Sequence, residues 1–78
     1  MMDEIKAICR VAIGITQRPR RRWNIFIAFA LYQEVARMLN ERLAEVNPEE
    51  WIVRADGWDC RMLLTAAMAL YGFVRGKE

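Results

Sequence analysis

The residues best suited to chemistry in this chain are arginines, and they are concentrated in residues 18–23, Arg-Pro-Arg-Arg-Arg-Trp. A guanidinium group presents N–H donors in a planar fork, which suits paired hydrogen bonds to phosphate or carboxylate. No acidic residue occurs between Glu4 and Glu34, so residues 1–33 carry six basic and two acidic side chains, whereas residues 34–78 carry six basic and eight acidic ones. The run therefore predicts a site that binds an anion.

The position of this basic run at the start of a predicted helix favours the same interpretation. A helix N-terminus is already positive, so each exposed arginine there is unfavourable by about 0.3 to 1 kcal/mol. An acidic protein surface is the first candidate ligand, and nucleic-acid phosphates, with a base stacked on Trp23, are the alternative. An anionic lipid surface is a third. A structural role is also open, with the arginines solvated or paired with the acids at positions 49, 50, 56 and 59 of the same or a second chain.

Two further tryptophans flank an expected break at Asp56-Gly57. Aromatic residues at this place can close the end of a hydrophobic core or anchor an interface, a role in which tryptophan is enriched. Together with the basic run they complete the set of candidate partner-binding residues. These are Arg18, Arg20, Arg21, Arg22, Trp23, Trp51 and Trp58.

The composition argues against catalysis, metal binding and cofactor chemistry. The chain has no histidine and no serine, which removes the commonest general base and nucleophile. Cys9 and Cys60 lie far apart without a CxxC motif, so we expect buried, reduced thiols rather than a metal or redox site. Asp56 and Asp59 are interpreted as helix caps rather than an acid pair. We therefore expect a protein that is not an enzyme.

Apolar residues recur at three- and four-residue intervals along most of the chain, which is the period of a helical face. This pattern predicts helices over about residues 3–16, 20–46, 48–54 and 57–75. Asn47 is the expected N-cap of the third, with Pro48 at its first position and Glu50 completing a capping box, and Gly76 is the expected C-cap of the last. The sequence predicts a single all-α domain over residues 1–78, a small helical bundle built on a long helical hairpin.

Two segments, residues 25–32 and 62–74, are apolar on nearly every side. A surface helix needs a polar face, so something must cover these segments, and a symmetric homodimer is the commonest arrangement that does so. Neither segment reaches the roughly 18 to 20 residues that span a bilayer, so we expect no integral membrane insertion.

The sequence therefore favours a small cytoplasmic interaction protein, dimeric and without catalysis. We expect it to bind a larger protein with an acidic surface and to modulate or inhibit it, as small phage proteins do with host machinery. The alternative is a nucleic-acid-binding regulator that uses the basic run of residues 18–23.

Overall fold

The structure, a computed structural model, describes residues 2–76 as a helical bundle. Its elements are α1 (Met2–Thr16), α2 (Arg22–Leu43), the short 3-10 helix η1 (Pro48–Glu50), α3 (Trp51–Ala55) and α4 (Trp58–Arg75). Helices cover 84% of the described residues and no strand occurs among them. The prediction of an all-α fold is confirmed.

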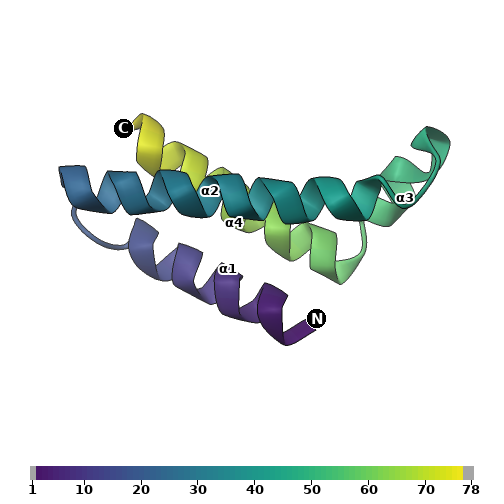
Figure 1. Cartoon of the computed structure of the whole chain (residues 1–78), viewed down its shortest axis with the longest axis horizontal. Coiled ribbons are helices and arrows are strands. Elements are labelled where there is room, and N and C mark those ends of the chain that lie inside the picture. The colour runs from purple at the N-terminus through teal and green to yellow at the C-terminus, as the bar shows by residue number, and fades with distance from the viewer. Residues whose placement is uncertain (1, 77–78) are drawn as a thin grey trace.

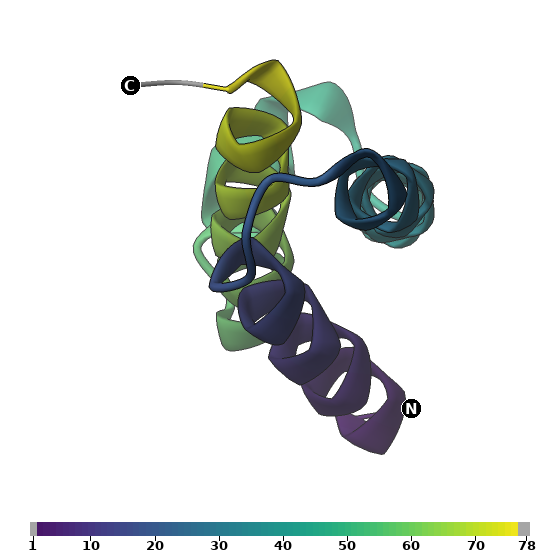
Figure 2. The same ribbon diagram turned by 90° about the vertical axis from the view of Figure 1, so that its left-hand side faces the viewer.

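The bundle is built on an antiparallel hairpin of α2 and α4, which the η1 and α3 segment connects at one end (Figure 1). Helix α1 packs mainly against α4 and less extensively against α2. Seen along the long axis, α1 and α4 form one layer and α2 lies beside it (Figure 2). The C-terminal end of α4 therefore lies near the start of α2, and the other end of the hairpin carries α3.

The core follows the helical period of the sequence. Helix α1 buries Ile5, Cys9, Ala12 and Ile15, which share one face at spacings of four and three residues. Helix α4 contributes the largest fully buried side chains, including Leu63 and Leu70, and α2 adds Ala28, Val35 and Met38. Burial of each Leu side chain stabilises the fold by about 1.5 to 3 kcal/mol.

Helix α2 is shorter than its predicted range of 20–46 at both ends. At its start, Pro19 precedes an extended Arg21 (φ −92°, ψ 157°), so the helix begins at Arg22. At its end, the carbonyl of Leu43 accepts a hydrogen bond from the indole N–H of Trp51 (2.9 Å), and the chain then turns. A side chain from beyond the turn thus helps to end the helix.

The expected caps differ in their outcome. Asn47 holds the N-cap position with Pro48 following it, as predicted, but its side chain makes no capping bond: its backbone carbonyl accepts from the Glu50 amide (2.8 Å), and residues 48–50 form a 3-10 turn. The interpretation of Asp56 and Asp59 as caps at the start of the last helix is wrong, because Gly57 is the N-cap of α4 and Asp56 is the C-cap of α3. Gly76 does end α4 in the left-handed conformation (φ 69°), as predicted.

The two apolar segments are only partly covered by the chain itself. Phe26 and Phe29 on α2 are exposed, as are Leu64, Met68 and Tyr71 on α4. We expected these segments to be covered on all sides. Residues 2–76 of one chain leave part of both segments exposed. Exposed apolar area of this extent is typical of interaction surfaces.

Candidate functional site

The basic run forms the connection between α1 and α2 together with the first two residues of α2, and it is exposed along its length. Backbone hydrogen bonds from Gln17 to Gly14 and from Arg18 to Ile15 end α1, and the side-chain amide Nδ2 of Asn24 donates to the carbonyl of Pro19 (2.8 Å). These bonds fix the path of the connection. The arginine side chains therefore start from a defined backbone at the end of the bundle where α4 finishes (Figure 1).

Arg20 has a role within the fold that the sequence did not predict. Its Nε donates to the carbonyl of Phe73 (2.8 Å) and its Nη2 to the carbonyl of Val74 (3.3 Å). These carbonyls belong to the last turn of α4, where the dipole is negative, and that of Phe73 also accepts from the backbone amide of Gly76 (3.3 Å). Gly76 makes room for this contact, because a Cβ at that position would lie 2.7 Å from Arg20 Nη2. Arg20 thus caps α4, and its charge is favourable there.

The other three arginines of the run have no such partner. Arg18, Arg21 and Arg22 are exposed, and they form no ion pair with any residue from 2 to 76. The acids considered as their partners, at positions 49, 50, 56 and 59, lie at the opposite end of the hairpin. Pairing with these four acids of the same chain is therefore not what the structure shows for the three side chains.

Trp23 adds an exposed aromatic group next to these arginines. Its side chain is 68% exposed and stacks on Phe26, with ring centroids 5.9 Å apart and an angle of 24° between the planes. Phe26 itself is 65% exposed. We call the surface made by Arg18, Arg21, Arg22, Trp23 and Phe26 the basic–aromatic surface. Phe26 was missed as a site residue, although its three-residue spacing from Trp23 places the two on one helical face.

Trp51 and Trp58 do not join this surface, because they lie at the other end of the hairpin. Trp51 donates its indole N–H to α2, and the ammonium of Lys6 lies 5.9 Å from the centroid of the Trp58 ring. Both rings are almost half exposed, so they cover the bundle end with one side only. The seven candidates from the sequence are thus divided between two distant places.

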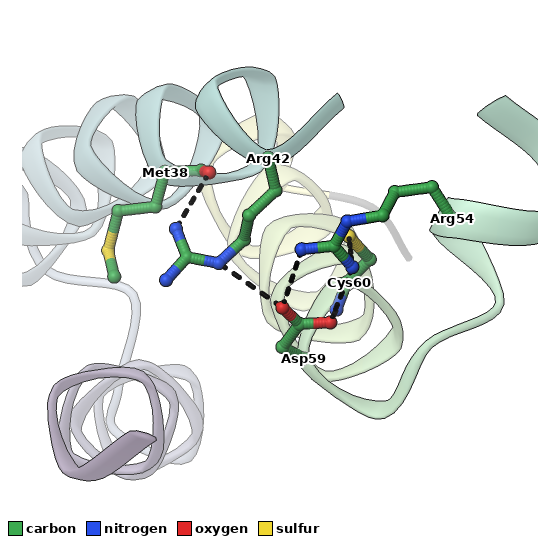
Figure 3. Close-up of polar contacts among 5 residues, drawn as sticks. All are labelled: Met38, Arg42, Arg54, Asp59 and Cys60. Atoms are coloured by element: carbon green, nitrogen blue, oxygen red, sulfur yellow. Dashed lines mark hydrogen bonds and ion pairs between the residues drawn. The ribbon is translucent and has the colours of Figure 1, made fainter. Parts of the chain in front are cut away.

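The end that carries the tryptophans is held by an ion-pair network around Asp59 (Figure 3). Arg54 donates hydrogen bonds from both terminal nitrogens to the two carboxylate oxygens of Asp59 (3.0 Å each). Arg42 Nε lies 3.3 Å from Asp59 Oδ2. The amide of Cys60 donates to the same carboxylate (2.7 Å). These bonds, chiefly those from Arg54, lower the pKa of Asp59 from 3.8 to about 2. The network links α2, α3 and α4 and was not anticipated from the sequence.

The two cysteines are buried, as predicted, and neither is bonded to the other. Burial raises the pKa of both thiols, so both are protonated near neutral pH. In the part of the chain that the structure describes, no three side chains of the metal-binding types are grouped to hold an ion. No helix within residues 2–76 combines the length and the apolar character needed to cross a bilayer.

The basic–aromatic surface presents groups that suit binding. Three guanidinium groups can bind oxyanions, and two stacked rings can bury apolar area or stack on a partner's planar group. Comparison with known proteins adds no relative: no family model, curated protein or solved structure matches this chain.

Proposed function

We propose that this chain is a small, non-catalytic interaction protein that binds a larger protein through the basic–aromatic surface. The observation that carries the proposal is the stacked, exposed pair of Trp23 and Phe26 beside three arginines that have no carboxylate partner among residues 2–76. An aromatic centre with a charged rim is the usual composition of an energetically important interface patch.

The partner that fits this surface is an acidic protein surface with an apolar centre. Carboxylates would relieve the repulsion between Arg21, Arg22 and the positive end of α2, and the aromatic pair would be desolvated on binding. Binding there would block the partner's own contacts, so modulation or inhibition is part of the proposal, in the manner of small phage proteins that act on host machinery. A cytoplasmic location and self-association into a homodimer complete it.

A pull-down with matched variants tests this proposal. Immobilised wild-type chain is incubated with nuclease-treated lysate, and the captured protein is then purified and its Kd measured by calorimetry. We expect W23A/F26A to weaken binding at least tenfold and R21A/R22A to weaken it in a salt-dependent way, because aromatic anchors dominate affinity and rim charges act through screened attraction.

The control is R10A, which removes an exposed arginine of α1 outside the surface. Its Kd should equal that of the wild type. Capture that is unchanged by W23A/F26A and by R21A/R22A would contradict the proposed surface.

A nucleic-acid-binding regulator is the second candidate, and the exposed Trp23 ring beside arginines is the observation in its favour. Three phosphate contacts on a single strand predict a slope of about −2 for log K against log salt concentration. Fluorescence titration of wild type and W23F with short single-stranded oligonucleotides measures this slope. Absence of binding at low salt would eliminate this candidate.

A further inference from the structure

A second surface lies on the face of the hairpin opposite α1, and it is distinct from the basic–aromatic surface. Between α2 and α4 runs a shallow apolar groove whose lining includes Tyr32, Leu64, Met68 and Tyr71, with Arg75 at its end. Leu64, Met68 and Tyr71 are each about half exposed or more. Arg75 packs over the Tyr71 ring and donates to its hydroxyl (2.6 Å), and no ion pair to it exists among residues 2–76.

The other end of the hairpin carries an apolar tip. In α3, Ile52 is 86% exposed and Val53 is 77% exposed, the highest values among the large hydrophobic residues described. Glu49 and Glu50 immediately precede the tip and form no ion pair within residues 2–76. Both α3 and the C-terminal end of α4 lie on the side of α2 away from α1 (Figure 1).

We propose that this face is the interface of an antiparallel homodimer, in which the α3 tip of each copy seats in the α2–α4 groove of the other. Ile52 and Val53 would meet Leu64, Met68 and Tyr71, and the carboxylates of Glu49 and Glu50 would reach Arg75. Apolar surface thus meets apolar surface, and acidic side chains meet a basic one. This inference rests on the self-association proposed above, but it does not depend on the other protein partner.

The antiparallel orientation follows from where the charges lie. In an antiparallel pair, the α3 end of each copy lies against the groove of the other, where Arg75 stands at the end. A parallel pair would instead place like charges against each other at both ends, which is unfavourable. The antiparallel contact uses the same patch on both copies and closes at two, as two-fold interfaces do.

Sedimentation velocity at several concentrations tests the proposal. The wild type should sediment as a dimer at micromolar concentration, whereas I52N/V53N and M68N should sediment as monomers. The control V11N changes an exposed aliphatic residue of α1, away from this face, and should remain dimeric. Reversal of charge in E49K/E50K or in R75E should weaken the dimer at least fivefold, and an equimolar mixture of the two variants should form a heterodimer.

A wild type that stays monomeric at all concentrations would overturn both self-association and this interface. A dimer that persists in both I52N/V53N and M68N would overturn the interface and leave self-association in place. Far-ultraviolet circular dichroism confirms that each variant is helical. If a variant unfolds, mixing V53C with M68C under mild oxidation gives an independent result: a disulfide-linked heterodimer supports the contact, and its absence, with a wild type that is dimeric, overturns it.

Discussion

The two ends of the α2–α4 hairpin use arginine in opposite ways. At the α3 end, Arg42 and Arg54 converge on Asp59, and all three side chains are largely covered. At the other end, Arg20 binds the last carbonyls of α4, while Arg18, Arg21 and Arg22 remain exposed and without an ion pair in the part of the chain from 2 to 76. At the α3 end the arginines pair with a carboxylate within the fold, whereas at the other end three of the four arginines of residues 18–22 are exposed.

This difference separates residues that hold the fold from residues that are available for binding. A guanidinium paired to a largely buried carboxylate stabilises the fold, because the carboxylate would otherwise lose hydration without compensation. A guanidinium in water at a helix N-terminus contributes nothing to stability and slightly opposes the helix. The comparison therefore predicts that substitutions at the two ends differ strongly in their effect on stability.

The largest effect on stability is expected from D59N. The substitution keeps the shape of the side chain but removes the charge that pairs with Arg42 and Arg54, so the free energy of unfolding should fall by about 2 kcal/mol. For a chain of this size, that loss corresponds to a decrease in Tm of roughly 8 to 16 °C. Urea and thermal unfolding followed by circular dichroism measure both quantities.

Asp56 provides the matched control for this prediction. Its carboxylate lies 3.6 Å from Arg61, and both side chains are at least 70% exposed. D56N should therefore change stability by less than about 0.5 kcal/mol. Equal losses of unfolding free energy in D59N and D56N would show that the Asp59 network stabilises the fold no more than an exposed ion pair does.

The pH dependence of stability follows from the same carboxylate. The pKa of Asp59 is about 2 in the folded protein, below its ordinary value of 3.8, mainly because Arg54 donates hydrogen bonds to it. A lowered pKa means that the stabilisation is present above about pH 4 and is lost as the pH falls towards 2. The difference in unfolding free energy between wild type and D59N should shrink over that interval. A difference that stays constant from pH 5 to pH 2 would refute this account.

A smaller effect is expected at the opposite end from R20A. Loss of its hydrogen bonds to the carbonyls of Phe73 and Val74 removes the side-chain cap of α4, which should cost about 1 kcal/mol. R20K, which keeps the charge but not the planar fork, should recover part of the loss. Protection of the amides in the last turn of α4, measured by hydrogen exchange, should decrease in R20A and not in R21A.

Much of the fold could be predicted because it depends on local pattern. The helical period and the positions of Pro19, Pro48 and Gly76 place the helices with errors of a few residues. The errors occur where a distant group decides the outcome. The indole of Trp51 bonds to Leu43 at the end of α2, and the Asn47 side chain is not used because its backbone carbonyl accepts the turn bond instead.

The candidate site was less predictable for the same reason. Arg20, Arg21 and Arg22 are equivalent in the sequence, and only the packing of α4 beside the α1–α2 connection distinguishes them. The Asp59 network likewise joins residues from three helices, so neither the spacing nor the type of its members indicates it. The exposure of Trp23, by contrast, is a consequence of its place on the outer face of α2.

The measurement that tests the central claim most directly is a set of single alanine substitutions at residues 18 and 20–23, with Tm and affinity for the purified partner both recorded. We predict that R20A lowers Tm by roughly 4 to 8 °C, the shift expected for a loss of about 1 kcal/mol, and changes affinity little. R21A, R22A and W23A should leave Tm within about 2 °C of the wild type and weaken binding, with W23A the most severe. The opposite division, with stability lost at Arg21, Arg22 or Trp23 and affinity lost only at Arg20, would contradict the account.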